Sequence, residues 1–476
     1  MSYETVIGLE VHLQLKTESK VFCGCSTNFG APPNTQTCPV CLGFPGSLPV
    51  LNRTALTLAA KVAIVLNCEI AKKIRFDRKN YFYPDLPKDY QISQFSQPLS
   101  GSGYLNVAIN GTKKHIRIRR VHLEEDTGKL FHQPGYSLID FNRSGIPLLE
   151  IVSEPDIYSP EEAYVYLCSL KSILEYIDVS DCNMEEGSLR CDANISIRKS
   201  GSRELGVKAE IKNMNSFKAV KAALEYERSR QIALVESGGR IVQETRLYDS
   251  SRNTTEPMRS KEEAHDYRYF PEPDLVPFDF EEGLLKDIGN EIPELPEPRK
   301  KRFISEYGLS DYDAAVMVSE KDVADYFERC VTMYKKPKVV ANWIMGDMAA
   351  YMRENAIKIK DLNLKLEHLV GMLKLIDDGL ISGKIAKELL IEMIRTGKSP
   401  EVLVKEKGLE QILDEGLLES VALQVILENP KPVEDFKNGK ENSLMFLVGK
   451  VMAKTKGKAN PIKVNEFLKQ KLKGDI

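Results

Sequence analysis

Strict alternation of apolar and polar residues constrains the first part of this 476-residue chain more than any other feature. In the segment 8–15, leucine and valine side chains alternate with Glu10, His12 and Gln14. Successive side chains of a β-strand point to opposite faces, so this pattern predicts a strand with one apolar and one polar face. A carboxylate and an imidazole on the same face are suited to binding a divalent metal or to acid–base chemistry.

The same alternation returns in two later segments and is accompanied by further acids. The polar positions are Arg190, Asp192 and Asn194 in 188–196, Lys208, Glu210 and Lys212 in 207–213, and the acids Glu124, Glu125 and Glu150 beside apolar residues. Strands that each carry a carboxylate on one face, with Arg and Lys between them, predict a sheet that binds Mg²⁺ and nucleotide phosphates. The alternative is a solvated face with ordinary cross-strand ion pairs.

The pattern changes at about residue 293. The stretch 294–302 is rich in proline and charge, which predicts a domain junction. Apolar residues then recur every three or four positions in 349–359, 362–375 and 381–394, which predicts helices, and a second boundary is expected near 405. The predicted fold class is therefore α+β, with a β-rich domain over 1–292, an all-α domain over 293–405 and a small helical tail domain over 406–476.

Composition excludes several classes of protein. With 66 Lys and Arg against 69 Asp and Glu, the chain is not a uniformly basic nucleic-acid binder. It contains no apolar run of about 18 residues, which predicts no membrane partner. An acid at position 4 and the lack of a basic, acid-poor leader argue against secretion and organelle import. Nine cysteines, an odd number, indicate a reducing compartment, so a cytoplasmic location is expected.

Four of those cysteines, Cys23, Cys25, Cys38 and Cys41, lie within nineteen residues. Two close pairs joined by a turn-rich loop can supply the four thiolates of a tetrahedral Zn²⁺ site. Four protein ligands would close the site, so its predicted role is structural. Buried thiols and disulfides are the alternatives, and disulfides conflict with a reducing compartment.

The C-terminal segment 437–476 has ten lysines, no arginine and three acids, a local net charge of +7. Small residues separate Lys450, Lys454, Lys456 and Lys458, whose side chains can contact phosphates. A solvated helical face is the alternative. No P-loop, Rossmann fingerprint, zinc-protease motif or hydrolase nucleophile motif occurs, so any use of ATP follows another plan.

Long motifs spread over almost the whole chain closely resemble the B subunits of the tRNA-dependent amidotransferases, the GatB family. They lie at 3–15, 76–85, 90–95, 122–126, 151–156, 184–194, 266–275 and 449–461. The resemblance implies a cradle domain related to the catalytic core of glutamine synthetase, followed by a helical domain and a helical tail. It also implies two partners of the same amidotransferase, the amidase that frees ammonia from glutamine (the A subunit) and a small third protein (the C subunit).

The reaction implied by the resemblance uses ATP and Mg²⁺ to phosphorylate glutamate misacylated to tRNA(Gln), or aspartate misacylated to tRNA(Asn). Ammonia then displaces phosphate and leaves the amide. This agrees with the acidic sheet, because a carboxylate is a poor electrophile until its oxygen is made a leaving group.

The resemblance also implies roles for individual residues. Glu10, His12, Glu125 and Glu150 are expected to bind Mg²⁺, with Glu124 as the alternative to Glu125. Contacts to the nucleotide or the acyl phosphate are expected from Arg190, Asp192, Lys208 and Glu210. The four cysteines match the zinc-bearing branch of the family, and the tail lysines become candidates for contacts with the tRNA backbone.

Two other functions compete with this interpretation. A tRNA-binding scaffold without catalysis is disfavoured because carboxylates would repel RNA phosphates unless metal intervenes. A free-standing ligase acting on a small amino acid is disfavoured by the lysine-rich tail and the two helical domains. The sequence leaves open the preferred tRNA, the course of the ammonia tunnel, the number of Mg²⁺ ions and the interfaces with the partners.

Overall fold

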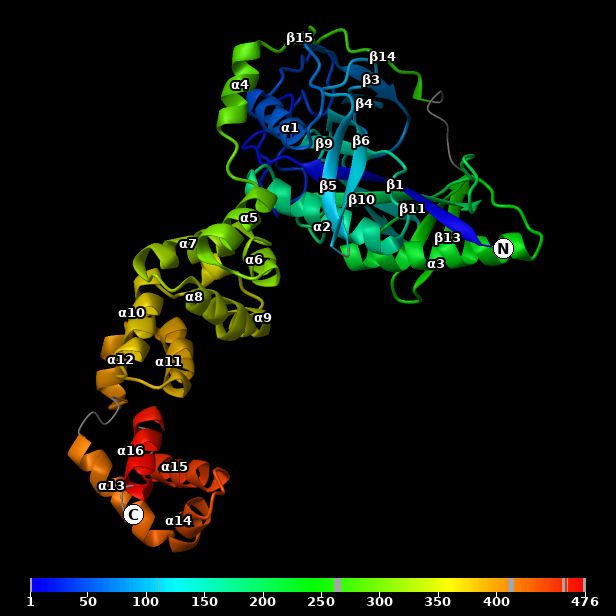
Figure 1. Ribbon diagram of the computed structural model, residues 1–476. Helices are drawn as coiled ribbons and strands as arrows, with labels where there is room; N and C mark the ends of the chain where they lie inside the picture. The colour runs from blue at the N-terminus through cyan, green and yellow to red at the C-terminus, as the bar shows by residue number, and fades with distance from the viewer. Residues whose placement is uncertain are drawn as a thin grey trace. The chain divides into compact units, whose positions relative to one another are not determined.

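The computed structural model describes residues 2–109, 111–260, 267–409, 415–455, 459 and 461–473. The chain forms two compact units, Met1–Pro296 and Glu297–Ile476. The first unit is built on β-sheets and the second on helices (Figure 1). The coarse prediction of a mixed α+β chain with a helical second part is confirmed.

The main sheet of the first unit has eight strands in the order β13-β12-β11-β10-β1-β9-β6-β5. Its neighbouring strands are antiparallel except β11 and β12, which are parallel. The strands are β1 (Tyr3–Gln14), β5 (Gly103–Ile109), β6 (Thr112–Glu125), β9 (Pro147–Ser153), β10 (Leu189–Lys199), β11 (Ala209–Lys212), β12 (Glu244–Asp249) and β13 (Thr254–Ser260).

Smaller sheets flank this one. β4 (Tyr90–Ser93) packs against β6 and pairs with β3 (Asp77–Asn80), which pairs in turn with β14 (Phe270–Pro271). The remaining strands form two pairs, β2 (Lys73–Ile74) with β15 (Phe278–Asp279) and β7 (Lys129–Gln133) with β8 (Tyr136–Asp140). Segments almost 200 residues apart in the chain thus meet beside the main sheet.

Four helices occur among the described residues of the first unit: α1 (Arg53–Val65), α2 (Pro160–Tyr176), α3 (Phe217–Glu236) and α4 (Glu282–Asn290). Asn52, Ser159 and Ser216 begin the first three, each accepting a hydrogen bond from a backbone N–H of the first turn. α2 packs against β5, and α3 packs against β10 and β13 (Figure 1). The apolar positions of β1 are almost completely buried, as the alternation predicts.

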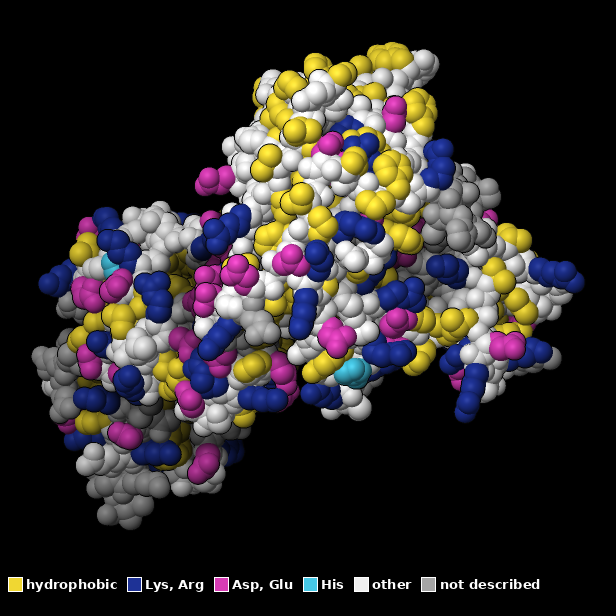
Figure 2. Space-filling view, turned by 90° about the horizontal axis from the view of Figure 1, so that it is seen from above, with side chains coloured by type: hydrophobic (Ala, Val, Ile, Leu, Met, Phe, Trp, Pro, Cys, Tyr) yellow, Lys and Arg dark blue, Asp and Glu magenta, His cyan; other side chains and the backbone are white. Residues whose placement is uncertain are grey.

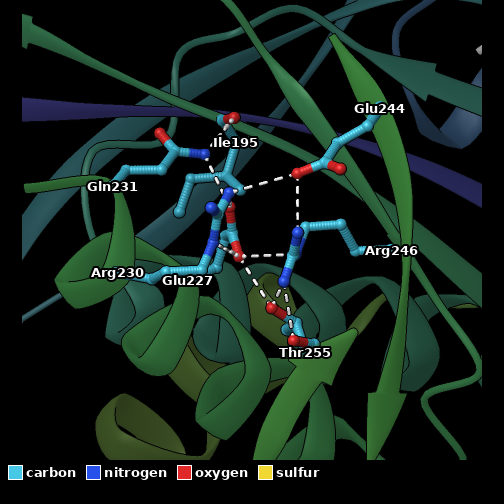
Figure 3. Close-up of polar contacts among 7 residues, drawn as sticks. All are labelled: Ile195, Glu227, Arg230, Gln231, Glu244, Arg246 and Thr255. Carbon is cyan, nitrogen blue, oxygen red and sulfur yellow. Dashed lines mark hydrogen bonds and ion pairs between the residues drawn. The ribbon is translucent and has the colours of Figure 1, made fainter. Parts of the chain in front are cut away.

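A buried ion-pair network attaches α3 to the edge of the sheet (Figure 3). The fully buried carboxylate of Glu227 accepts hydrogen bonds from Arg230 at 2.6 Å and from Gln231 at 2.9 Å. Thr255 of β13 donates to it at 2.8 Å, and Arg246 of β12 lies 3.3 Å away. One carboxylate therefore connects a helix to two strands.

Replacing Glu227 by alanine is expected to lower the free energy of unfolding of the first unit by about 1.5–3 kcal/mol, because Gln231 and Thr255 lose a buried charged acceptor. The two guanidinium groups of the network keep only Glu244 as an acidic partner among the described residues. The exposed Glu225 on the same helix provides the matched control, and Glu225→Ala is expected to stay within about 0.5 kcal/mol of wild type. Urea unfolding followed by circular dichroism measures both. Equal stability of the two variants would contradict this role for the network.

The second unit is helical. Its α-helices are α5 (Pro296–Tyr307), α6 (Asp311–Met317), α7 (Lys321–Met333), α8 (Pro337–Trp343), α9 (Ala349–Asn355), α10 (Leu366–Asp377), α11 (Gly383–Thr396), α12 (Pro400–Lys407), α13 (Glu415–Glu428), α14 (Pro430–Lys437), α15 (Asn442–Lys454) and α16 (Pro461–Lys473). Two separate hydrophobic cores form, one within 303–404 and the other within 418–472. No helix among the described residues is long and apolar enough to cross a membrane.

The stretch 294–302 is not a linker throughout, since α5 begins at Pro296. Proline is tolerated in the first turn of a helix, where the backbone N–H would have no intrahelical partner. The predicted helices correspond to α9, α10 and α11, although α9 ends four residues earlier than the segment 349–359. The three-domain division at 292 and 405 stays a prediction.

Candidate active site and zinc site

The pairing of four strands places polar side chains in a row across the main sheet. The register aligns His122 of β6 with Glu150 of β9, Glu150 with His12 of β1, and His12 with Arg190 of β10. Paired residues of neighbouring strands project to the same face. The polar face predicted from the alternation therefore exists, and its side chains come from strands distant in sequence.

Three groups of this face converge as a metal site requires. His12, Glu124 and Glu150 each contribute one possible ligand atom, and these three atoms lie within 4.8 Å of one another. The distance between His12 Nε2 and Glu150 Oε2 is 3.7 Å. Ligand atoms about 2.1 Å from a Mg²⁺ ion would lie at such separations. Two carboxylates and one imidazole leave coordination positions for water and phosphate oxygens, so the donor set fits a nucleotide-bound divalent cation.

His122 supports the two carboxylates of this cluster. Its Nε2 lies 3.1 Å from Glu150 and 3.6 Å from Glu124, and the ring is 2% exposed. Burial disfavours the charged imidazole, but the two carboxylates outweigh it and raise the pKa of His122 to about 9. Burial likewise disfavours the ionised carboxylates, but His122 outweighs it and lowers the pKa of Glu150 and of Glu124. Both acids are thus held ionised and able to bind a cation.

Strands β3 and β4 bring two further groups to the cluster. Ser93 of β4 donates a hydrogen bond to Glu124 at 2.9 Å. Lys79 of β3 is half-buried, and although burial disfavours its charge, attraction to Glu124 and Glu150 raises its pKa. The two acids thus favour the charged form of Lys79.

A second polar group lies on the same face, one row further along. Asn194 donates a hydrogen bond to Glu10 at 2.9 Å, and Asp192 is the cross-strand neighbour of Glu10. Lys212 pairs with Asp192 and lies 3.5 Å from Glu210. Two residues along a strand span about 6.8 Å, so Glu10 lies one row away from His12, and its predicted binding of Mg²⁺ stays a prediction.

The structure separates the remaining candidates for nucleotide contacts. Arg190 donates to Asp126 at 2.9 Å, and Gln14 donates to the same carboxylate at 2.8 Å. Lys208 precedes β11 and is exposed, so the strand predicted over 207–213 is shorter than expected. The contact of Lys208 with phosphate stays a prediction.

The two adjacent acids at the end of β6 are placed differently. Glu124 joins the cluster, whereas Glu125 pairs with Lys88 at 2.6 Å and accepts a hydrogen bond from the backbone N–H of Ile92 at 2.8 Å. The geometry therefore favours Glu124, the alternative, over Glu125 as the acid beside His12, and the binding of Mg²⁺ by either acid stays a prediction. Neighbouring residues of a strand point to opposite sides, so only one of the two can join His12.

Sequence reasoning assigned no role to His122 or Lys79. The signal for His122 is its spacing, two residues before Glu124 and hence on the same strand face. No comparable signal exists for Lys79, because it reaches the cluster only through the packing of β3 and β4 beside β6.

The four cysteines converge as predicted. Their sulfur atoms lie within 4.8 Å of one another, and Cys38 Sγ is 3.9 Å from Cys41 Sγ. Thiolates 2.3 Å from a tetrahedral Zn²⁺ would be about 3.8 Å apart, so the set fits zinc. A hydrogen bond from Cys23, with the ammonium of Lys20 nearby, lowers the pKa of the Cys41 thiol, and the same hydrogen bond raises the pKa of Cys23, so Cys41 is the member of this pair whose thiolate is favoured.

Of the four tail lysines, Lys456 and Lys458 lie outside the described residues. Lys450 and Lys454 are one turn apart on α15. Lys450 is exposed, and Lys454 pairs with Glu428 of α13 at 2.7 Å. An RNA phosphate would therefore compete with a carboxylate for Lys454.

Comparisons with known proteins agree with this arrangement. Residues 5–286 match the family model of the GatB/GatE catalytic domain, and residues 325–472 match that of the GatB domain. The B subunit of the aspartyl/glutamyl-tRNA(Asn/Gln) amidotransferase of Caldanaerobacter subterraneus subsp. tengcongensis is 56% identical over 99% of this chain and 100% of its own length. The proteins of the same name from Thermoanaerobacter sp. and Brevibacillus brevis are 57% and 55% identical, over 99% of this chain and 100% and 99% of their own lengths. The chain therefore belongs to the GatB family, the B subunits of the tRNA-dependent amidotransferases.

Proposed function

We propose that the polar face of the main sheet is where ATP activates the misacylated amino acid. As a member of the GatB family, the chain is part of an ATP-dependent ligase of translation that makes Gln-tRNA(Gln) or Asn-tRNA(Asn). The observation that carries the proposal is the convergence of His12, Glu124 and Glu150 beside the cation of Lys79. We further propose that this unit is the cradle domain related to the catalytic core of glutamine synthetase.

The chemical problem is to make a carboxylate accept a nucleophile. Transfer of the γ-phosphoryl group of ATP to the side-chain carboxylate forms an acyl phosphate, and attack by ammonia then releases inorganic phosphate and the amide. Charge accumulates on the transferring phosphoryl oxygens, so catalysis rests on positioning and neutralisation. His12, Glu124 and Glu150 would hold Mg²⁺, which would supply positive charge to neutralise the phosphoryl oxygens.

The chain's own residues supply the remaining functions. Lys79 provides positive charge at the cluster, and His122 holds Glu124 and Glu150 ionised and oriented. The second group, with Glu10, Asp192, Glu210 and Lys212, is proposed to contact the rest of the nucleotide or the acyl phosphate. Arg190 is paired with Asp126. To contact a phosphate, it must either break this ion pair or bind the phosphate and Asp126 at the same time.

Two partners and a structural zinc complete the proposal. Ammonia is proposed to come from the amidase partner, with the small third protein bracing the pair, and zinc to be held by Cys23, Cys25, Cys38 and Cys41. The direct test measures glutamine-dependent amidation of misacylated tRNA by the chain alone and with both partners. ADP formation that needs this chain and misacylated tRNA supports the proposal. If amidation continues after His12, Glu124 and Glu150 are replaced by alanine, the chain acts as a scaffold without catalysis.

The tail lysines are proposed to contact the tRNA backbone. A variant with glutamate at Lys450, Lys454, Lys456 and Lys458 is expected to bind tRNA more weakly, because four phosphate-directed charges are reversed. The slope of log Kd against log salt concentration should fall by roughly one unit for every phosphate that is no longer neutralised.

Lys440→Glu is the matched control, since Lys440 pairs with Asp435 at 2.8 Å and is not among the proposed contacts. Filter binding across a salt series measures both variants. A fourfold variant with wild-type affinity and wild-type slope would exclude the tail lysines from the RNA interface.

A further inference from the structure

An aromatic surface begins beside the metal-binding cluster. Its four rings, Tyr81, Phe95, Tyr267 and Tyr269, are called the aromatic ledge here. Tyr81 and Tyr267 have ring centroids 5.7 Å apart, Tyr267 and Tyr269 6.1 Å, and Tyr269 and Phe95 4.1 Å with nearly parallel planes. The rings therefore form one continuous run.

One end of the ledge is at the active site. The ammonium of Lys79 lies 4.9 Å from the ring centroid of Tyr267 and 5.7 Å from that of Tyr81, and the same ammonium is attracted by Glu124 and Glu150. A ligand lying on the ledge would thus extend directly to the groups proposed to bind ATP and metal.

The other end of the ledge is exposed. Phe95 has 43% of its surface exposed although Tyr269 stacks on one of its faces. Phe82 and Phe270 nearby in sequence are 83% and 46% exposed. Hydrophobic side chains gather on the face seen from the β3, β4 and β14 end, with charged side chains among them (Figure 2). Grouped exposed rings are costly to hydrate and mark a binding surface.

Local structure fixes the ledge in place. Phe270 of β14 pairs with Arg78 of β3, which brings the two tyrosine segments together. Between Tyr267 and Tyr269, the exposed Arg268 adopts a φ of 44°, and Asn80 donates a hydrogen bond to its carbonyl at 2.8 Å. A left-handed backbone at a non-glycine residue is sustained only where its surroundings hold it. Lys79 places positive charge beside two of the tyrosine rings.

We propose that the aromatic ledge stacks the unpaired bases at the 3′ end of the misacylated tRNA and so delivers the aminoacyl ester to the cluster. Unpaired RNA bases are bound by stacking on aromatic rings and arginine planes, with cations near the backbone. The ester is attached to the terminal nucleotide, so the adjoining bases must lie on the surface next to the cluster.

A run of several rings favours the 3′ end of tRNA as the ligand, because it offers several bases to stack. The adenine of ATP is a single base and needs only one ring. This proposal rests on the function proposed above, because it assumes that the tRNA-bound amino acid reacts at the His12 cluster. The two can nevertheless fail separately. If misacylated tRNA does not stimulate ADP formation by the wild-type complex, the proposed function fails, whatever the ledge binds.

The test uses the assembled enzyme and two full-length deacylated tRNAs, one intact and one with an abasic ribose at its 3′ end. For wild type, loss of the terminal base is expected to weaken binding about tenfold, the contribution of one stacked base. For Phe95→Ala the two tRNAs should bind almost equally, and for the matched control Phe95→Tyr the difference should return. In steady-state assays, Phe95→Ala should raise the KM for misacylated tRNA about tenfold and leave the KM for ATP near wild type.

Three results would overturn the proposal. They are equal binding of the two tRNAs by wild type, a tenfold difference that persists in Phe95→Ala, and a KM for ATP that rises in Phe95→Ala while tRNA binding is retained. The last would assign the ledge to the adenine of ATP. The wild-type comparison needs no variant, so equal binding of the two tRNAs overturns the proposal even where Phe95→Ala fails to assemble.

Discussion

The His12→Ala variant of the assembled enzyme is expected to form ADP in response to misacylated tRNA at least about 10³-fold more slowly than wild type. The imidazole of His12 is one of three groups that converge on the proposed Mg²⁺ position. Losing a metal ligand removes several kcal/mol of charge stabilisation from phosphoryl transfer, and each 1.4 kcal/mol is tenfold in rate. Glu150→Gln is expected to slow ADP formation to a similar extent, because glutamine keeps the shape of the glutamate side chain but carries no negative charge.

His132→Ala is the matched control. His132 is exposed on β7, bonded to Ser137 at 3.0 Å, and outside the main sheet. The assay measures ADP release with and without misacylated tRNA, alongside tRNA affinity, which both variants should retain. Glu10→Ala belongs in the same series, because Glu10 contacts Asn194 in the neighbouring row. Wild-type rates in His12→Ala or Glu10→Ala would remove that residue from the site.

The second large effect is expected at the cysteine cluster. Cys41→Ser should reduce bound zinc from one equivalent per chain to almost none, because Cys41 is the buried member of four converging sulfurs. Metal binding by such sites contributes on the order of 10 kcal/mol to the folded state of small zinc domains. The segment around 20–50 should then become sensitive to protease, while chelators that remove zinc from wild type should reproduce the effect.

Cys168→Ser is the matched control, since Cys168 lies on α2 and is not one of the four clustered cysteines. The Cys168→Ser protein should therefore keep its zinc. Metal content by atomic absorption and limited proteolysis measure both proteins. A purified wild-type chain without zinc, or a Cys41→Ser chain that keeps a full equivalent, would contradict a four-cysteine site.

The sequence predicts those parts of the fold whose burial follows a simple period. The alternation in 8–15 and 188–196 identifies the two central strands and their polar faces, because one side of each strand packs in the core. The convergence of the four cysteines is predictable for another reason, since the ligands of a zinc site must be close in space and these residues are also close in sequence.

A β-bulge in β6 determines which of Glu124 and Glu125 shares a face with His122. The buried apolar positions of β6 are Ile116 and Ile118 before the irregularity near residue 119, and Val121 and Leu123 after it. An extra residue in one strand exchanges the two faces, so parity counted from the start of the strand places Glu125, and not Glu124, on the polar face.

Other features depend on long-range packing. Lys79 and the aromatic ledge reach the cluster through β14, β3 and β4, strands of two to four residues that no periodicity reveals. The sequence does not predict helix α5, because the prolines in its first turn are also typical of a segment between domains. Pairing of Lys454 with Glu428 likewise joins two helices that are separated by another helix in the chain.

The central claim is that His12, Glu124 and Glu150 bind one divalent ion that serves ATP. Anomalous X-ray diffraction from crystals of the assembled enzyme containing Mn²⁺ and a non-hydrolysable ATP analogue tests it most directly. The account predicts a manganese peak about 2.0–2.3 Å from His12 Nε2 and from an oxygen of each carboxylate, with analogue phosphate oxygens in the same coordination sphere. Bound analogue whose metal lies elsewhere, with these three side chains uncoordinated, would contradict it.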